Sequence, residues 1–390
     1  MVSDFDGLSR EQLNRRTSRK WSLDPGTIGA WVAEMDFGTA PAVQEALLAG
    51  VRDQVFGYLT PSLAAEVAAA TSDWYADEYA WRPEVERIHS ITDVLSGLEI
   101  AVRNFSRPGS AVIVPTPAYM PFLTLPGLLG RRIIEVPGRL VAGRWELDLD
   151  RIDDAFAAGG GTLLLCNPHN PTGRVLDRAE LEAVAAVVER HDGLVLADEV
   201  HAPLRFGRPH LPYAALSHAT AAHTVTITST SKAWNVPGLK AAQLILSSPE
   251  HERSYRAHDI DHLHEPSTLG VLAATAAYRH GREWLQDVNA YLDRNRLLLA
   301  ELLDAALPQV EYIAPEATYI GWLDCAALDV PGDPADFFRA EAGVTLTAGG
   351  RCGTGYDRFV RLVFATPAPI LREIVGSLAA AAARRPTAVA

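Results

Sequence analysis

Short apolar runs alternate with amphipathic stretches through most of the chain. In residues 178–190 the apolar side chains recur every three or four positions, which is the period of a surface helix. The apolar runs are too short for helices and end at polar or turn-forming residues, as buried strands do. They occupy residues 111–114, 163–166, 194–197, 224–227 and 242–246. This alternation predicts an α/β fold with a mainly parallel central sheet.

The pattern changes from about residue 290 onward. A helix rich in Leu and Arg is predicted over residues 291–306, and an alanine-rich helix is predicted near the C-terminus. Between them, residues 359–364 read as a strand. We therefore expect an N-terminal arm that forms part of a small domain (1–50), a large domain (51–288) and a small C-terminal domain (289–390), whose last residues fray.

Composition narrows the class of protein. Of the 390 residues, 48% are hydrophobic, so the chain can bury a large core. The formal net charge of −13 argues against a nucleic-acid partner. No apolar segment reaches the ~18 residues that span a bilayer, and the N-terminus lacks the apolar core of a signal peptide. These features predict a cytoplasmic protein without a membrane partner, in which Cys166, Cys325 and Cys352 stay reduced.

Lys232 is the candidate nucleophile. It follows the apolar run 224–227 in the sequence Thr-Ser-Thr-Ser-Lys, so small hydroxyl residues precede it. A free lysine amine has a pKa of ~10.4 and is a poor nucleophile at neutral pH. Held as a Schiff base to the aldehyde of pyridoxal phosphate, the same nitrogen exchanges with the amine of a substrate. Most lysines only solvate a surface, so this hypothesis depends on the residues that accompany Lys232.

Two polar residues follow neighbouring apolar runs. Asn170 lies in the turn Asn-Pro-His-Asn-Pro-Thr-Gly after residue 166, and Asp198 directly ends the run 194–197. Open α/β sheets bind their ligands at such strand ends. A buried carboxylate needs a cation, which a protonated pyridine nitrogen supplies, and an amide can donate a hydrogen bond to a phenolate-type oxygen. Taken singly, Asp198 could instead cap a helix, and Asn170 could belong to an ordinary turn.

Arg361 places a charge inside the strand-like run 359–364. An inward-facing arginine needs an anion, and its planar fork matches a carboxylate, so Arg361 is the candidate for binding the α-carboxylate of a substrate. A structural ion pair with an internal Asp or Glu is the alternative. His258, His262 and His264 suggest a metal site only weakly, because no recognised ligand framework surrounds them, and no metal is predicted.

These segments together resemble a known family. The chain is similar to fold-type I pyridoxal-phosphate enzymes, and among them to the cystathionine β-lyases and cysteine-conjugate C–S lyases related to class I and II aminotransferases. Residues 31–37 (Trp-Val-Ala-Glu-Met-Asp-Phe) and 198–201 (Asp-Glu-Val-His) resemble the lyase branch, whereas residues 167–173 and Ser231-Lys232 are shared with aminotransferases. The resemblance covers nearly the whole chain. It implies an aminotransferase-like fold of type I, with helices flanking the sheet and a smaller C-terminal α/β domain.

The resemblance implies roles for individual residues of the large domain. Lys232 would carry the cofactor and shuttle a proton, Asp198 would pair with the pyridine nitrogen, and Asn170 would bond the ring oxygen. His201 would lie one helical step beyond Asp198, near the same oxygen. Tyr119 would stack on the ring and act as a second catalytic residue, although an ordinary loop aromatic is the alternative reading.

Further residues would hold the phosphate. Val94 and Leu95 would contribute backbone N–H groups at the start of a helix, which suits a dianion, and Ser229 a hydroxyl. Lys240 stands where many aminotransferases carry an arginine, so it would supply a point charge without bidentate geometry. Tyr58 would reach the phosphate and substrate of a neighbouring subunit, which requires a homodimer. Its alternative reading is a packed interface aromatic.

The implied reaction is α,β-elimination of L-cystathionine or another L-cysteine S-conjugate to pyruvate, ammonia and a thiol. Without a good leaving group the same residues would support transamination, so an aminotransferase is the alternative. Glu34 and the residues after His201 depart from the pattern of the family and leave the substrate open. A third hypothesis is a regulatory protein that binds a transcription factor, against which the complete set of site residues argues.

Overall fold

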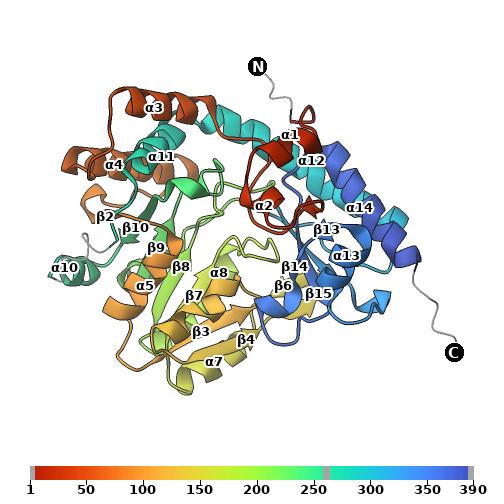
Figure 1. The fold of residues 1–390 in the computed structure, drawn as a ribbon. Coiled ribbons are helices and arrows are strands. Elements are labelled where there is room, and N and C mark those ends of the chain that lie inside the picture. Colours follow the sequence, from red (N-terminus) through yellow and green to blue (C-terminus); the bar gives the residue numbers. More distant parts are fainter. Residues whose placement is uncertain (1–4, 258–263, 385–390) are drawn as a thin grey trace.

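The computed structural model describes residues 5–257 and 264–384 and is built around a seven-stranded sheet (Figure 1). The strands, in spatial order, are β2 (Ile88–Ile91), β10 (Ala242–Leu246), β9 (Thr224–Thr228), β8 (Leu194–Asp198), β7 (Gly160–Cys166), β3 (Ala111–Thr116) and β4 (Ile133–Pro137). Within this sheet only β10 runs antiparallel to its neighbours. The predicted mainly parallel sheet is therefore confirmed, and all five apolar runs lie in it.

Helices bury both faces of this sheet, which explains why its strands are apolar throughout. On one face, Leu164 and Cys166 pack with α5 (Val94–Asn104) and α10 (Pro249–Ala257). On the other face, Leu163 and Leu165 pack with α7 (Leu149–Ala157) and α8 (Arg178–Arg190). Successive residues of one strand thus serve two separate cores, as the two-residue period of a strand requires.

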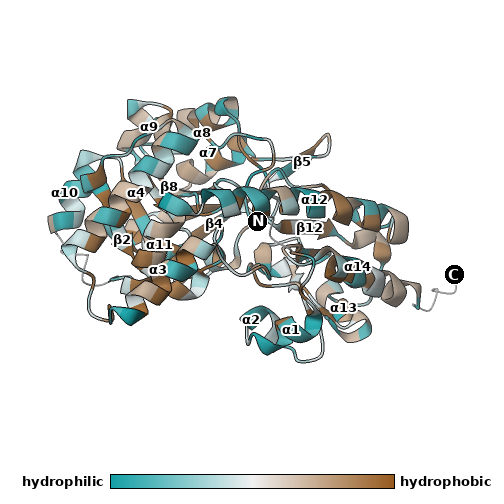
Figure 2. Ribbon diagram, turned by 90° about the horizontal axis from the view of Figure 1, so that it is seen from above, coloured by the Kyte–Doolittle hydropathy of each residue, from teal (hydrophilic) through white to brown (hydrophobic). Residues whose placement is uncertain are grey.

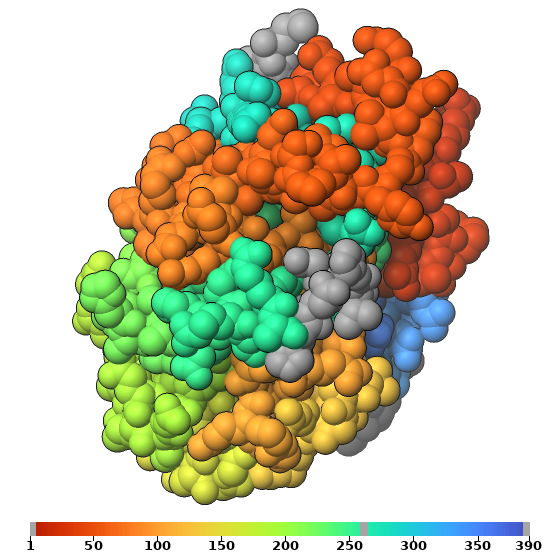
Figure 3. Space-filling view, turned by 90° about the vertical axis from the view of Figure 1, so that its left-hand side faces the viewer, coloured from red at the N-terminus to blue at the C-terminus, as the bar shows by residue number. Residues whose placement is uncertain are grey.

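Three further helices cover the β2–β10 side of the sheet. They are α3 (Pro41–Arg52), α4 (Pro61–Tyr79) and α11 (Thr268–His280), and α11 packs against both of the others. The orange part of the chain that includes α3 and α4 spreads over the upper part of the face in Figure 3. The remaining elements of this region are the short helices α6 (Leu125–Leu128) and α9 (His218–Ala222) and the hairpin β5 (Arg139–Val141) and β6 (Arg144–Glu146).

The C-terminal part contains a second, antiparallel sheet. Its strands, in spatial order, are β11 (Glu311–Tyr312), β12 (Ile320–Asp324), β15 (Phe359–Val363) and β14 (Thr347–Ala348), and its helices are α12 (Arg282–Ala306), α13 (Pro334–Ala342) and α14 (Ala368–Ala383). Helix α12 begins at Arg282, earlier than the predicted residue 291. It is continuous through residues 288 and 289, where the sequence suggested a domain boundary.

The N-terminal arm joins this C-terminal part in space. It consists of α1 (Arg10–Arg15), α2 (Arg19–Ser22) and β1 (Ile28–Gly29), and β1 pairs in parallel with β13 (Val344–Thr345). Figure 2 shows α1 and α2 beside α13. The arm is fixed by a buried ion pair of 2.8 Å between Lys20 and Asp36. No helix of residues 5–257 and 264–384 is long and apolar enough to cross a membrane.

Candidate active site

Four candidate residues meet at the carboxyl ends of adjacent parallel strands. Asp198 ends β8, Asn170 follows β7, Lys232 follows β9 and Tyr119 follows β3. These strands lie side by side in the order β9, β8, β7, β3. The topology of the sheet therefore collects residues that are more than a hundred positions apart in the chain, at the edge where open α/β sheets bind ligands.

The amine of Lys232 lies inside this cluster. Its Nζ donates a 3.0 Å hydrogen bond to the carbonyl oxygen of Ala33, from the N-terminal arm. Burial and, next to it, the positive charge of Arg361 lower the pKa of Lys232 to about 8, although the charges of Glu34 and Asp198 oppose the shift. The neutral, nucleophilic form of Lys232 is therefore far more populated at neutral pH than that of an ordinary lysine.

Asp198 is a buried carboxylate, 4% exposed, that forms no ion pair with any residue described in the structure. Oδ1 accepts a 3.1 Å hydrogen bond from the Val200 N–H, and Oδ2 lies 3.7 Å from Sγ of Cys166. Burial raises the pKa of Asp198 to about 6, although the Val200 bond acts in the opposite direction. An ionised Asp198 thus lacks the cation that burial calls for.

Arg361 points into the same cluster from β15 and is 2% exposed. Its Nη1 donates to Oδ1 of Asn170 at 3.2 Å, and Nη2 donates to the carbonyl oxygen of Trp31 at 3.0 Å. Both partners are neutral oxygens. Among the described residues, Arg361 therefore does not form the structural ion pair that was the alternative reading. Burial lowers the pKa of Arg361, and its Nε has no hydrogen-bond partner. An anionic ligand would relieve this charge.

His201 and Tyr119 border the cluster. His201 lies in a turn after β8 rather than in the expected helix, since the chain bends there through successive short-range bonds. Burial lowers the pKa of His201 to about 3, so its imidazole is neutral, and its buried Nδ1 has no partner. Tyr119 is partly buried and packs edge-on against Phe122, with ring centroids 5.3 Å apart. Burial raises the pKa of Tyr119, on which the charges of Arg361 and Asp198 also act.

The predicted phosphate residues gather at the start of α5. This helix begins at Val94, and Oδ1 of Asp93 caps it by accepting from the Ser96 N–H at 2.9 Å. The N–H groups of Val94 and Leu95 lie in the first turn and have no intrahelical acceptor. Lys240 is anchored here by a 2.7 Å ion pair with Asp93, so part of its charge is already offset.

Two residues predicted to bind the phosphate, Ser229 and Tyr58, are not at the start of α5. The hydroxyl of Ser229 donates to the Ala241 carbonyl at 2.7 Å and accepts from the Ser231 N–H at 3.0 Å. Tyr58 is 88% exposed and lies outside the cluster of its own chain. Of the histidines considered for a metal, His258 and His262 lie outside the described residues. Among residues 5–257 and 264–384, no group of three or more His, Cys, Asp or Glu could hold a metal ion.

A segment that the sequence indicated only through its family resemblance forms one wall of the site. Residues 31–38 lie against the Lys232 loop, because Asn235 accepts from the Met35 N–H at 2.8 Å and donates to the Met35 carbonyl at 2.9 Å. The hydroxyl of Tyr319 donates at 3.0 Å to the same Ala33 oxygen that Lys232 contacts. The contacts with Lys232 and Tyr319 are made by a backbone carbonyl, which every residue type has. The residue types in this segment therefore could not have indicated these contacts.

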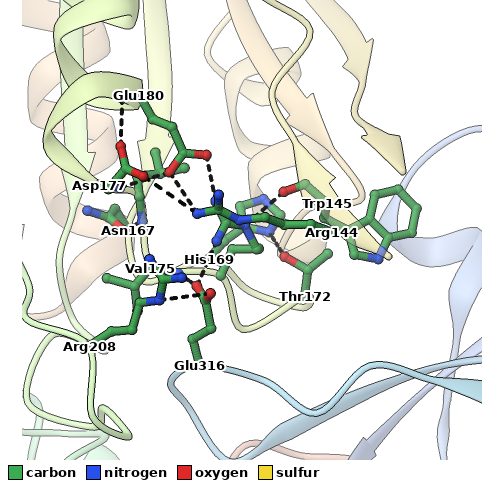
Figure 4. A network of polar contacts seen from close by, with 12 residues as sticks. Arg144, Trp145, Asn167, His169, Thr172, Val175, Asp177, Glu180, Arg208 and Glu316 are labelled. Carbon is green, nitrogen blue, oxygen red and sulfur yellow. Dashed lines mark hydrogen bonds and ion pairs between the residues drawn. The ribbon is translucent and has the colours of Figure 1, made fainter. Parts of the chain in front are cut away.

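A buried charge network fixes the loop that carries Asn170. Arg174 donates to Glu316 at 2.7 Å, to Glu180 and to the carbonyl oxygen of Trp145. Glu316 also accepts from the Val175 N–H at 2.9 Å. In Figure 4 Glu316 extends toward this cluster from the C-terminal part of the chain, opposite Glu180. The network therefore ties the loop after β7 to the second sheet.

Known proteins share this sequence and arrangement. The sequence pattern of the family "aminotransferase class I and II" matches residues 32–378. The chain belongs to this family. It is 37% identical to a cystathionine β-lyase of Corynebacterium glutamicum, over 93% of this chain and 96% of that protein. It is 31% identical to the cystathionine β-lyase PatB of Bacillus subtilis, over 92% and 94%.

Solved structures of the aminotransferase class I and II fold superpose closely on this chain. A putative PLP-dependent β-cystathionase of Corynebacterium diphtheriae is 37% identical, covers 97% of this chain and 99% of its own, and gives a TM-score of 0.91. The PLP-bound C–S lyase of Staphylococcus hominis is 27% identical, with coverage of 98% and 100% and a TM-score of 0.91. The family and the aminotransferase-like fold predicted from the sequence are thus confirmed.

Proposed function

We propose that this protein is a pyridoxal-phosphate-dependent C–S β-lyase that cleaves L-cystathionine or another L-cysteine S-conjugate to pyruvate, ammonia and a thiol. The cystathionine β-lyases and PLP-bound C–S lyase among its relatives confirm the predicted reaction class and cofactor. The structural observation that carries the proposal is the meeting of a partly buried lysine of lowered pKa and an unpaired buried carboxylate, Lys232 and Asp198, at one edge of the sheet.

The residues of the site fit pyridoxal phosphate. Asp198 lacks a cation within the described chain, and a protonated pyridine nitrogen would supply it. Oδ1 of Asn170 is taken by Arg361, which leaves the amide nitrogen as a donor for the ring oxygen. The neutral His201 presents an unpartnered Nδ1 on the same side. The first turn of α5, with Val94, Leu95 and the adjacent Lys240, suits the phosphate.

When bound, pyridoxal phosphate withdraws electrons from the substrate Cα and so supplies the electron sink for the reaction. Arg361, whose Nε has no partner, binds the substrate α-carboxylate. The Lys232 amine, which the Ala33 carbonyl orients through a hydrogen bond, would take the Cα proton. Tyr119 and residues 31–38 cover the site and exclude water while the thiolate leaves.

A homodimer is part of this proposal. Tyr58 cannot serve the site of its own chain from its exposed position, so it would contact the phosphate and substrate of a second copy. Large exposed apolar side chains accompany it at Leu48, Val51 and Phe56. We also place the protein in the cytoplasm, because Cys166, Cys325 and Cys352 are free and buried in the structure.

A paired assay on purified protein tests the function. One reaction contains L-cystathionine or S-ethyl-L-cysteine without an acceptor, and pyruvate and free thiol are followed. The other contains an ordinary amino acid with a keto acid as acceptor. Pyruvate and thiol without an acceptor, lost in Lys232→Ala together with the Schiff-base absorbance, are the expected result. Turnover only with the acceptor would reject the lyase.

An aminotransferase is the second candidate. The residues that bind the cofactor and the α-carboxylate serve both reactions, and the family includes aminotransferases by its description. A putative aminotransferase of Bacillus subtilis is 25% identical over 89% of this chain. The two reactions diverge only after the Cα proton has been removed, so the leaving group at Cβ decides between them.

A further inference from the structure

The side chain of Arg19 lies over the ring of Trp31, and its charge acts on Tyr119 of the site. Its guanidinium carbon lies 5.6 Å from the centroid of the Trp31 ring. The carbonyl oxygen of the same Trp31 accepts the 3.0 Å hydrogen bond from Arg361. The indole nitrogen of Trp31 donates to the Lys20 carbonyl at 3.3 Å, which fixes the backbone next to Arg19. Trp31 therefore lies between two guanidinium groups, one buried in the site and one exposed.

Glu34 stands on the neighbouring part of the same segment. It follows Ala33, whose carbonyl oxygen is 3.0 Å from the Lys232 amine, and its negative charge acts on Lys232 and Tyr319. Glu34 also lines a cavity of about 290 Å³, whose other wall includes Ser18, the residue before Arg19. Ser18 and Glu34 thus border one space, beside the segment whose Ala33 carbonyl contacts Lys232.

Neither Arg19 nor Glu34 has an oppositely charged partner within the part of the chain that the structure describes. Arg19 stacks on Trp31 but forms no ion pair or hydrogen bond there, and Glu34 forms no ion pair. Two other cations of the arm are paired, Arg15 with Glu11 and Lys20 with Asp36. In a chain of net charge −13, an unpaired arginine at the site also attracts anions that the rest of the surface repels.

We propose that Arg19 and Glu34 bind the far end of the substrate and select L-cysteine S-conjugates whose leaving thiol carries its own charged groups. Arg19 contacts a distal carboxylate and Glu34 a distal ammonium, so a conjugate with a distal amino acid, such as L-cystathionine, uses both. This inference rests on the proposed function. With the α-carboxylate bound at Arg361, the chain beyond Cβ extends toward Arg19 and Glu34.

Four substrates that differ in distal charge test this inference. S-ethyl-L-cysteine has none, S-(2-carboxyethyl)-L-cysteine carries a carboxylate, S-(2-aminoethyl)-L-cysteine carries an ammonium, and L-cystathionine carries both. For each, kcat/KM for pyruvate release and the dissociation constant from the change in cofactor absorbance are measured. The proteins are the wild-type holoenzyme, Arg19→Gln, Glu34→Gln and the control Arg15→Gln, which removes a charge from the same arm.

Arg19→Gln is expected to lower kcat/KM for the carboxyethyl conjugate relative to the ethyl conjugate by about three- to twentyfold, as one partly exposed charged contact would. Glu34→Gln is expected to do the same for the aminoethyl conjugate, and both variants should weaken L-cystathionine. Arg15→Gln should change none of these ratios. Because each effect is a ratio within one protein, a general loss of folding or cofactor does not imitate it.

Equal effects on all four substrates, or a carboxylate-selective loss in Arg351→Gln instead of Arg19→Gln, would overturn the inference. Arg351 is the relevant competitor, because it is exposed and its charge acts on Arg361. Absence of pyruvate from every substrate would reject the lyase function. In that case the ratios of dissociation constants still decide whether Arg19 and Glu34 read the distal charge.

Discussion

Three charged side chains at the site, two of them buried and Lys232 partly buried, lack the partners that buried charges normally have. Asp198 has no cation, Arg361 has only neutral oxygens, and Lys232 has only the Ala33 carbonyl among the described residues. Each of these side chains costs free energy in the protein without cofactor and substrate. A cationic ring next to Asp198, an α-carboxylate at Arg361 and an aldehyde at Lys232 would remove these costs. The residues that lower the stability of the empty protein are therefore the ones that bind cofactor and substrate.

Replacing Asp198 by Asn is expected to stabilise the cofactor-free protein. The pKa of Asp198 is about 6 when folded and 3.8 as its ordinary value, so between these values the folded state binds more protons. Stability therefore falls as the pH rises through this window, and the cost is complete above pH 6. Asp198→Asn should raise the free energy of unfolding at pH 8 by about 1–3 kcal/mol, measured by urea unfolding.

The pH dependence is the control for this prediction. At pH 5 the gain in stability should shrink, because much of Asp198 is then protonated in the folded protein. The same variant should bind pyridoxal phosphate more weakly, since it cannot neutralise the ring nitrogen. A loss of stability of equal size at pH 5 and pH 8 would contradict the prediction and would point to damaged packing.

The lowered pKa of Lys232 predicts how fast the protein captures its cofactor. Only the neutral amine attacks the aldehyde, so below pH 8 the rate should fall about tenfold for each pH unit. Above pH 8 it should level off. Stopped-flow absorbance after mixing cofactor-free protein with pyridoxal phosphate measures this, with Lys232→Ala as the blank. A rate that still climbs at pH 10 would show an ordinary lysine.

At the scale of elements, the polar residues at the ends of the strands could be predicted from the sequence. The packing of residues 31–38 over these strand ends could not. Asp198 and Asn170 could be found because an apolar run delivers each of them to one edge of the sheet. The position of residues 31–38 depends instead on contacts with Asn235 and Tyr319, which lie about 200 and 285 residues away. No local pattern encodes such pairings. The turn that holds His201 could not be predicted for the same reason. It is closed by hydrogen bonds between particular backbone groups.

A substitution at Gly173 tests the contact between the loop that carries Asn170 and the segment before the second sheet. Its φ is +68°, and a Cβ there would lie 2.1 Å from Cβ of Pro315 and 2.8 Å from the carbonyl oxygen of Ala317. Gly173→Ala should therefore cost about 3 kcal/mol or more of stability and speed cofactor release, as the Asn170 loop is displaced. Thermal unfolding and the decay of cofactor absorbance on dilution measure both effects.

Gly207→Ala is a matched control for that variant. Gly207 has a similar φ of +76°, but a Cβ there would meet nothing within 4 Å. Its cost should be only the ~1 kcal/mol of a left-handed alanine, without an effect on cofactor release. Equal costs for both variants would show that backbone strain, and not the contact with Pro315 and Ala317, sets the requirement for glycine at residue 173.

At the scale of the whole molecule, the site is assembled from three separate stretches of chain. The central sheet supplies Lys232, Asp198 and Asn170, the second sheet supplies Arg361, and the N-terminal arm supplies the Ala33 carbonyl. Only a complete fold brings them together. One further stretch is unused by its own subunit, since Tyr58 and the apolar side chains of Leu48, Val51 and Phe56 are exposed.

A mixing experiment decides whether Tyr58 completes the site of a second copy. Lys232→Ala lacks the amine, and Tyr58→Ala lacks the phenol, so each homodimer should be impaired. After the two are unfolded together and refolded, half of the dimers are mixed. In these, one site combines the intact Lys232 of one subunit with the intact Tyr58 of the other, which restores about a quarter of all sites at random pairing. If Tyr58 acts within its own subunit, every site keeps one defect and mixing restores nothing. If the chain is a monomer, sedimentation shows a single copy and the two proteins cannot complement each other.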